Sequence, residues 1–384
     1  MSASQAQEVR FPCESCGAEL TYRPGSRVIA CAHCGHENPI ELGEEGPWGR
    51  AAREDALAER DLAAALRDLA GRAPLEDRKS IDCQNCGAVF DLDEGVHAEA
   101  CPYCGTSVVA DPASSRRITP QGLVPFALTE QAGQAALKAW IKGLWFAPSD
   151  LKAYARDDGR LSGVYLPYWT FDCDSTSRYS GQRGRAVYTS RNVTVMVKGK
   201  PQRRRRQVRT IRWSPVAGQV ARHFDDVLVS AGGAVPPELI DGVGPWDLSA
   251  LTAYREEYLS GFRSELYRAG PDLGFRAAQA VMKATIREDV RRDIGGDAQR
   301  IQRIDSRFDN ISFKHILLPV WVAAYSYRGR SFPFVVNGQS GRVRGARPYS
   351  LLKILAASAL ALLLVGGAVV LYLADQGQLQ LPSW

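Results

Sequence analysis

The longest apolar run in the chain is found near its C-terminal end. Residues 354–373 read ILAASALALLLVGGAVVLYL, twenty positions without a charged side chain. A helix rises about 1.5 Å per residue, so this segment would be roughly 30 Å long, which matches the hydrocarbon core of a bilayer. The pattern predicts one C-terminal transmembrane helix at 354–373 and a short tail at 374–384.

Basic residues flank the predicted membrane helix on one side only. Arg342, Arg344, Arg347 and Lys353 precede it, and no Lys or Arg follows it in the sequence. Positively charged residues next to a membrane helix are retained in the cytoplasm. We therefore expect a tail-anchored, single-pass protein of the cell membrane, with residues 1–353 in the cytoplasm and the C-terminus outside.

Residues 118–349 contain both helical and alternating apolar patterns. We expect them to form one α+β body with an antiparallel sheet. Thr129 is a suitable N-cap for a helix that runs to Trp145, and Phe275–Ile294 has helical spacing that ends at a Gly-Gly pair. Strands are predicted at 123–128, 166–171, 193–197, 207–213, 220–229, 300–313 and 315–327.

Two short sequences in the body resemble each other. Leu166-Pro-Tyr-Trp169 recurs as Leu318-Pro-Val-Trp321, and each is followed within about twenty residues by a Gly-Gln dipeptide. The repeat predicts two related sheet units. Coincidence stays open as the alternative, because only a few positions match.

Eight of the nine cysteines form two copies of one pattern. Each copy has two C-x2-C pairs separated by 14 residues, and the second copy lies 70 residues after the first. The pairs are Cys13 and Cys16, Cys31 and Cys34, Cys83 and Cys86, and Cys101 and Cys104. A glycine follows every pair, which suits a turn with positive φ. Four thiolates at this spacing form a closed tetrahedral zinc site. We predict two zinc ribbons, at 1–45 and 76–112, that hold two structural zinc ions.

The segment between the ribbons, at 46–75, is rich in Ala, Leu, Arg and Glu. Leu57, Leu62, Leu66 and Leu69 recur near helical spacing, which predicts an amphipathic connecting helix. Thiolate zinc sites require reduced cysteine, which agrees with a cytosolic location for the ribbons. The ninth cysteine, Cys173, lies between aromatic residues, and we interpret it as a small buried apolar side chain.

Charge divides the chain into two unlike parts. Residues 1–112 hold 10 Lys and Arg against 20 Asp and Glu, a net charge of −10, and the remainder carries 48 − 10 = 38 basic and 42 − 20 = 22 acidic residues, a net charge of +16. Phosphate binding requires a cationic surface. The acidic ribbons are therefore poorly suited to nucleic acid, and we interpret them as protein-docking or structural modules.

The most basic local feature is an arginine run in a predicted hairpin with its turn near 198–203. It comprises Arg203, Arg204, Arg205, Arg206, Arg209 and Arg212. Near a membrane, such residues are attracted to anionic lipid. We expect this run to contact lipid or a protein partner, with a solvated hairpin tip and nucleic-acid binding as the alternatives.

Motifs for catalysis are missing from the sequence. It contains no phosphate-binding loop of the G-x4-G-K-[ST] type, no G-x-S-x-G and no H-E-x-x-H. Asp172, Asp174, Asp225 and Asp226 are candidate acids, but we interpret them as turn and strand-end residues. We expect a protein that is not an enzyme and has no small-molecule substrate.

Six stretches of the body together resemble one bacterial family. They are 163–172 (GVYLPYWTFD), 179–184 (YSGQRG), 294–297 (IGGD), 317–321 (LLPVW), 336–341 (VNGQSG) and 347–350 (RPYS). With the ribbons and the anchor, they resemble membrane-anchored zinc-ribbon proteins that are encoded with phage-shock-protein-A-like and flotillin-like (SPFH) partners and are sometimes labelled primosomal protein N′ or helicase-like. The resemblance implies an adaptor that recruits cytosolic scaffold proteins to the membrane in membrane stress or membrane organisation.

Two classes of function are therefore carried forward. The first is an adaptor whose ribbons hold a cytosolic scaffold of the phage-shock-protein-A-like or SPFH-like kind. In that class, apolar residues between the cysteine pairs, such as Leu20 and Tyr22, would offer a strand edge to the partner. The second is a membrane-tethered regulator that binds nucleic acid through the arginine run and the nearby Trp213. Docking of the acidic ribbons on the basic body of the same chain is a rival to partner binding.

Overall fold

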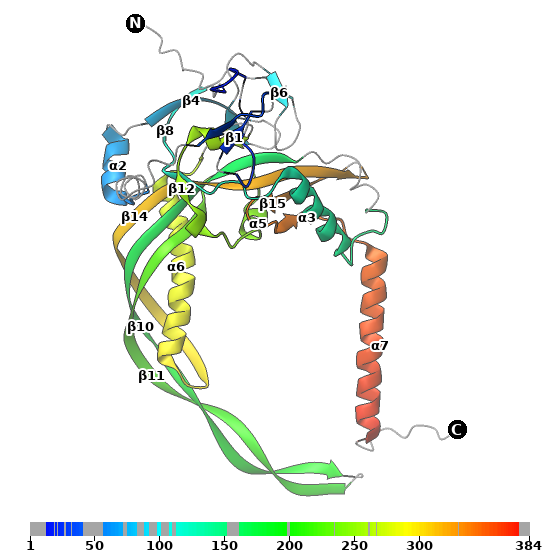
Figure 1. Ribbon diagram of the computed structural model, residues 1–384. Coiled ribbons are helices and arrows are strands. Elements are labelled where there is room, and N and C mark those ends of the chain that lie inside the picture. The colour runs from blue at the N-terminus through cyan, green and yellow to red at the C-terminus, as the bar shows by residue number, and fades with distance from the viewer. Residues whose placement is uncertain are drawn as a thin grey trace.

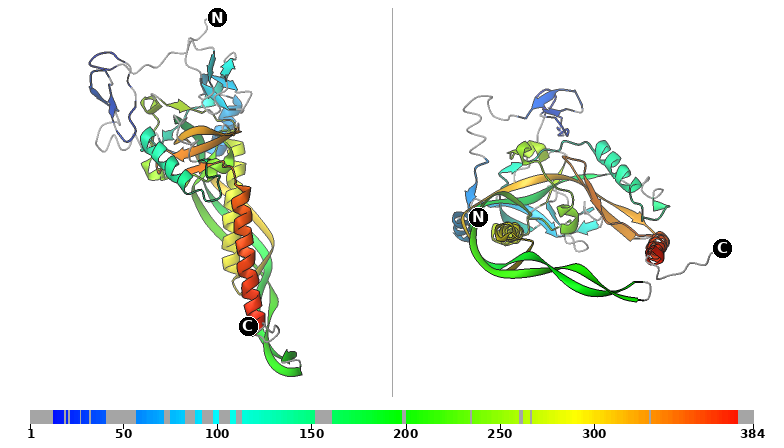
Figure 2. Two further views of the ribbon diagram at one scale, coloured as in Figure 1. Left: turned by 90° about the vertical axis from the view of Figure 1, so that its right-hand side faces the viewer. Right: turned by 90° about the horizontal axis from the view of Figure 1, so that it is seen from below.

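We describe the protein from a computed structural model of the 384-residue chain (Figure 1). The described residues are 13–18, 20, 22–26, 28–31, 33–40, 57–71, 75–82, 88–91, 98–100, 107–109, 113–151, 161–197, 200–233, 235–259, 262–265, 267–328 and 330–375. Figure 2 shows the same arrangement from two further sides. The α+β class that the sequence predicts is confirmed within these residues.

A large sheet forms the frame of the body. Its main path runs β11 (Lys200–Ser230), β10 (Ser162–Val197), β14 (Ala298–Tyr327), β15 (Arg330–Asn337) and β16 (Val343–Gly345), with each neighbouring pair antiparallel. Short strands extend it: β3 (Arg60–Asp61), β9 (Gly122–Leu123), β12 (Thr252–Ala253) and β13 (Arg263–Ser264).

The predicted antiparallel sheet is confirmed along the main path, but the sheet as a whole is mixed. β13 pairs with β10 in parallel, and β9 pairs with β14 in parallel. Both are two-residue strands that a connecting segment lays beside a long strand, so no hairpin constrains their direction. Neither is marked by an alternating pattern long enough to read from the sequence.

The predicted strands are also joined into longer ones. The segments at 207–213 and 220–229 are parts of β11, and those at 300–313 and 315–327 are parts of β14. The strand expected at 123–128 is reduced to β9, because Pro125 has no N–H to donate and cannot continue a ladder. β10 extends to Val197 and β11 begins at Lys200, so the arginine run expected beside the turn belongs to strand β11.

The two Leu-Pro-x-Trp sequences lie directly opposite each other. In the β10–β14 ladder Leu166 pairs with Leu318, and Gly163 pairs with Trp321. The surrounding strand segments are buried on both faces: Trp169 and Phe171 face α6, whereas Val164, Leu166 and Tyr168 belong to the cluster around α5. Double burial explains why this stretch is apolar at consecutive positions.

Helix α6 (Pro271–Ile294) covers one face of the long strands (Figure 1). Its buried residues recur every three or four positions, as the sequence predicts for residues 275–294; they include Phe275, Ala278, Met282 and Ile286. Gly274 allows close approach, because a Cβ atom there would lie 2.6 Å from Cδ1 of Trp169. The helix ends at Gly295, whose φ is +64°.

The remaining helices surround the sheet. α3 (Glu130–Lys142) is capped by Thr129, whose hydroxyl accepts from the N–H of Ala132 at 3.3 Å; it ends before the expected Trp145. α5 (Pro237–Asp241) and the 3-10 turns η1 (Leu248–Ala250) and η2 (Glu256–Leu259) lie in the 235–266 connection. α7 (Leu351–Asp375) contains the predicted membrane segment.

The connection between the ribbons is only partly helical. α2 (Leu62–Gly71) begins at Leu62, because Asp61 acts as its N-cap and accepts from the N–H of Ala64 at 2.6 Å. The preceding residues, 57–61, form a turn and β3, and Leu57 is not in the helix. The rest of the predicted connecting helix at 46–56 lies outside the described residues.

Small strands mark the two ribbon regions. β1 (Val28–Ala30) pairs with β2 (Glu37–Pro39) in the first. In the second region β4 (Leu75–Asp82) pairs with β5 (Val89–Asp91) and β8 (Ala113–Ile118), and β6 (Ala98–Ala100) pairs with β7 (Ser107–Val109). The second cysteine set, Cys83, Cys86, Cys101 and Cys104, lies outside the described residues.

Candidate metal centre, membrane segment and basic hairpin

The first cysteine set forms a compact cluster. The Sγ atoms of Cys13, Cys16, Cys31 and Cys34 all lie within 4.8 Å of one another. Two edges of the cluster, Cys13 to Cys34 and Cys16 to Cys31, measure 3.6 Å. A tetrahedral zinc ion with Zn–S bonds of about 2.3 Å gives S–S edges of about 3.8 Å, whereas a disulfide would bring the sulfurs to about 2.0 Å. The arrangement fits a four-cysteine metal site.

Backbone turns hold these cysteines in place. The N–H of Gly17 donates to the carbonyl of Cys13 at 2.8 Å, and the N–H of Gly35 donates to that of Cys31 at 2.9 Å. Gly17 and Gly35 have φ values of +73° and +76°, so the positive φ that the sequence predicts after these two pairs is confirmed. Glycine is the residue that adopts such turns without strain.

Asn38 connects the two halves of the cluster, and the sequence analysis missed it. Its side chain is 7% exposed, accepts from the N–H of Glu14 at 3.1 Å and donates to the carbonyl of Ile29 at 3.3 Å. The amide nitrogen also lies 3.9 Å from Sγ of Cys13. A buried polar residue next to a cysteine pair was the available signal, since buried amides need partners.

The local electrostatics favour a bound cation. Burial opposes ionisation of Cys13, but the backbone N–H groups of Cys16 and Ser15 outweigh it and lower the pKa to about 6. The N–H of Ala18 also favours the Cys16 thiolate, yet the sulfurs of Cys34, Cys31 and Cys13 raise the pKa of Cys16 to about 12. Four thiolates at this distance repel one another unless a cation is bound to them all.

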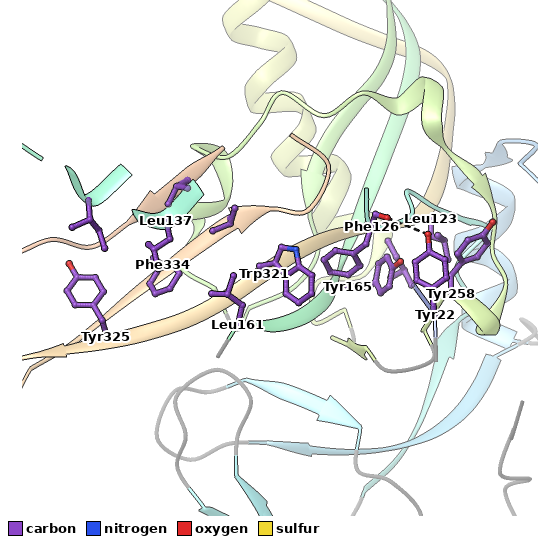
Figure 3. Packing of buried hydrophobic residues seen from close by; sticks show 14 of the residues in the cluster. Tyr22, Leu123, Phe126, Leu137, Leu161, Tyr165, Tyr258, Trp321, Tyr325 and Phe334 are labelled. Carbon is purple, nitrogen blue, oxygen red and sulfur yellow. Dashed lines mark hydrogen bonds between the residues drawn. The ribbon is translucent and has the colours of Figure 1, made fainter. Parts of the chain in front are cut away.

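The first ribbon is packed against the body. Leu20 and Tyr22 are 3% and 2% exposed, and they share a core cluster with Phe126, Tyr165 and Tyr258 (Figure 3). The rings of Tyr22 and Tyr258 are 5.1 Å apart, edge to face. The expectation that Leu20 and Tyr22 offer an apolar edge to a partner is therefore wrong, because the body itself covers them.

Helix α7 is long and apolar enough to cross a membrane by its length and composition, and its most apolar window is 0% buried. Within the described residues its hydrogen bonds to the body lie at its start, where the N–H of Ser350 donates to the carbonyl of Phe146 and Nζ of Lys353 donates to that of Ala147, both at 2.8 Å. A cavity of about 590 Å³ lies between its first turns and the end of α3. Trp145 beside it is 79% exposed.

The arginine run lies on β11 near the end of the long hairpin. Arg203, Arg205, Arg206, Arg209 and Arg212 are exposed. Arg204 lies opposite Val193 in the ladder. The nearby Trp213 is covered by Arg300, whose guanidinium carbon lies 4.1 Å from the ring centroid.

Three of the candidate acids come together at a bulge of β10. Oxygens of Asp172, Asp225 and Asp226 lie within 4.8 Å of one another, and the N–H of Asp226 donates to Asp172 at 2.8 Å. Nζ of Lys314 lies 3.1 Å from Asp226 and 3.0 Å from Glu59. Because this lysine supplies the positive charge, we interpret the cluster as a structural joint between residues 57–61 and the body.

Burial and the Glu59 carboxylate raise the pKa of Asp172 to about 7. Hydrogen bonds from Asp172, Ser312 and Lys314 lower the pKa of Glu59 to about 2. The pKa values of these two neighbouring carboxyl groups thus lie far apart. Cys173 is 1% exposed, which confirms the prediction that it is buried, and burial raises the pKa of its thiol to about 11.

Comparison with known proteins found one similar sequence along most of the chain. A protein of Bacillus subtilis (strain 168), described as "Uncharacterized protein YdjG", is 22% identical over 345 residues, which span 89% of this chain and 91% of that protein. No family model matches the chain, and no solved structure matches it.

Proposed function

We propose that this chain is a membrane-anchored zinc-ribbon adaptor that brings a cytosolic scaffold protein to the inner face of the membrane. The observation that carries the proposal is the distribution of its parts. The four-cysteine cluster lies in a ribbon that is packed on the body. A separate apolar helix, α7, has none of its most apolar segment buried. A closed metal site stabilises a surface without leaving a position for a substrate.

The second ribbon is the docking module in this proposal. The apolar edge of the first ribbon is covered by the body, so its role is structural. The scaffold would be of the phage-shock-protein-A-like or SPFH-like kind that the family resemblance implies, and the process would be membrane stress or membrane organisation. In this account the protein catalyses no reaction, and two zinc ions are its only cofactors.

The topology follows from the positive residues before α7. Residues 1–353 would face the cytoplasm and the tail would lie outside. Protease added to intact cells should then leave the chain N-terminal to Lys353 uncut, and the same protease added to lysed cells should degrade it. Cutting of the ribbons in intact cells would contradict the orientation.

Affinity capture tests the adaptor role. The full chain, solubilised in detergent, should retain the scaffold, and the Cys83→Ser, Cys86→Ser double variant should lose it while staying in the membrane fraction. Cys173→Ser is the matched control, because Cys173 is buried in a core cluster of the body that includes none of the first ribbon's described residues. Capture that survives loss of the second ribbon would move the docking site to the body.

Nucleic-acid regulation is the second candidate, and the exposed arginine run favours it. The acidic ribbons and the covered Trp213 speak against it, since single-stranded binding uses exposed aromatic side chains for stacking. Binding of the solubilised chain to a labelled oligonucleotide at physiological salt would support this candidate over the adaptor.

A further inference from the structure

The end of the long hairpin is a two-stranded ribbon that projects beyond the rest of the sheet (Figure 1). β14 pairs with β10 only as far as Gly184, which lies opposite Ala298. Residues 185–194 of β10 and 203–212 of β11, which we call the distal hairpin, pair only with each other in the described chain. An isolated two-stranded hairpin is at best marginally stable in water. A binding partner would therefore stabilise it.

The charge of the hairpin is entirely positive. Residues 175–224 contain 13 Lys and Arg and no Asp or Glu. Arg185 lies opposite Arg212, and Arg191 lies opposite Arg206. Like charges in directly opposed positions destabilise a β-ladder. The ion pairs formed within the described part of the chain include none of these four arginines. The repulsion is thus uncompensated inside the described protein, and an anionic surface would relieve it.

The direction of α7 restricts where that surface can be. α7 and the distal hairpin leave the body on the same side, and the end of the hairpin lies near the C-terminal end of α7 in all views (Figures 1 and 2). A bilayer crossed by α7 in this direction would also enclose the arginines, which are unfavourable in hydrocarbon. When α7 spans the membrane, the hairpin must therefore lie in another direction relative to it.

The junction between α7 and the body permits such a change. No residue of α7 belongs to the three core clusters of the body. The hydrogen bonds that hold its start come from Ser350 and Lys353, and a cavity of about 590 Å³ lies beside them. A turn at 346–350 would break few contacts and would leave the body next to the bilayer, with the hairpin along its surface.

We propose that the distal hairpin lies along the cytoplasmic leaflet and binds the phosphates of anionic phospholipids, with α7 turned away from it across the bilayer. The inference rests on the membrane anchoring in the proposed function. Lipid is favoured over nucleic acid because α7 begins directly after the body and holds the hairpin near the membrane. In its described part the hairpin also offers a single exposed aromatic side chain for stacking, Tyr188 at 62% exposed, since Trp213 is covered by Arg300.

Hydrogen exchange of the full chain in nanodiscs tests the inference. Discs of phosphatidylcholine alone are compared with discs that also contain phosphatidylglycerol. We expect amide exchange in residues 185–194 and 203–212 to be slowed at least about fivefold by phosphatidylglycerol, and the slowing to disappear at high salt, as it does for electrostatic lipid contacts. Equal exchange in the two discs would overturn the proposal.

Matched charge variants identify the residues responsible. Arg203→Glu, Arg205→Glu and Arg206→Glu together should abolish the slowing. The control is a triple variant on the exposed side of α6 with the same change in net charge: Arg276→Glu, Lys283→Glu and Arg287→Glu. It should preserve the slowing of exchange. If duplex DNA slowed the exchange of the hairpin in phosphatidylcholine discs and phosphatidylglycerol did not, the ligand of the hairpin would be nucleic acid and the lipid proposal would be wrong. A chain that enters neither disc would instead refute the membrane anchor.

Discussion

The hydroxyl of Tyr22, in the first ribbon, lies 3.4 Å from the carbonyl oxygen of Phe126, in the body, and donates to it (Figure 3). The N–H of Gly25 reaches the same oxygen at 2.8 Å. Around this contact the ring of Phe126 stacks on that of Phe262 at 4.4 Å. The first ribbon is thus joined to the body by buried aromatic packing.

Replacement of Tyr22 should separate the first ribbon from the body. Tyr22→Ala removes a side chain that is 2% exposed, and loss of a buried aromatic costs about 3–5 kcal/mol. Tyr22→Phe removes only the hydroxyl, and we expect a loss of about 1 kcal/mol. Hydrogen exchange of residues 28–40 should rise strongly in the first variant and slightly in the second. Equal, small effects would mean that the ribbon does not depend on this contact.

Metal analysis should find two zinc ions in each purified chain and one in Cys16→Ser. The remaining three thiols cannot close a tetrahedral site, so the first ribbon should unfold, since a structural metal supplies much of the folding energy of such a module. Cys173→Ser should keep both ions. Iron in place of zinc, or one zinc ion in the natural chain, would contradict the prediction of two zinc ribbons.

Asp172 should make the stability of the body depend on pH. Its pKa is raised from 3.8 to about 7 in the folded state, so its stabilising contribution is present below pH 3.8 and is lost as the pH rises through 7. Asp172→Asn cannot ionise, and its amide can still donate to Glu59. We expect the stability of this variant relative to the natural chain to increase by about 1–2 kcal/mol between pH 5 and pH 8, because solvent near the cluster weakens the full effect.

Thermal melting in detergent at the two pH values measures this difference. Asp305→Asn, an exposed position on β14, is the control and should show no such gain at pH 8. If Asp172→Asn were destabilised equally at both pH values, Asp172 would stabilise the body through a hydrogen bond that does not depend on its ionisation.

Gly274 should tolerate no side chain. The Cβ atom of an alanine would lie 2.6 Å from Cδ1 of Trp169 and 3.2 Å from Cζ of Phe171, and both of these side chains are fully buried. Overpacking of this kind costs about 1–3 kcal/mol, which exceeds the gain of about 1 kcal/mol from better helix propensity. Gly274→Ala should therefore lower the melting temperature. Gly366→Ala, with nothing within 4 Å, should leave the melting of the body unchanged.

Much of the body could be predicted from periodicity. The spacing of Phe275, Met282 and Ile286 predicts α6, and Thr129 marks the start of α3, since both signals are local. The length of β10 could not be predicted, because residues 172–192, between its two predicted segments, are mostly polar and have no sustained apolar pattern. β9 and β13 could not be predicted either, since two-residue parallel pairs depend on contacts far apart in the sequence.

The candidate sites show the same division. The spacing of Cys13, Cys16, Cys31 and Cys34 predicts the cluster, because a four-thiolate zinc site needs two cysteine pairs of this kind. The joint of Glu59, Asp172 and Lys314 is assembled from three distant segments, and no local pattern marks it. The burial of Tyr22 depends on the surface of the body, which the sequence of the ribbon alone does not contain.

The central claim is that this chain determines where its scaffold partner is located, and the most direct test is the distribution of that partner between membrane and cytosol. In cells with the full chain, the partner should sediment with the membrane. In cells with a chain that lacks residues 351–384, we predict that the partner and the truncated chain appear together in the cytosol, with any membrane-bound remainder released by high salt. A partner that stays on the membrane when the truncated chain leaves it would contradict the adaptor function.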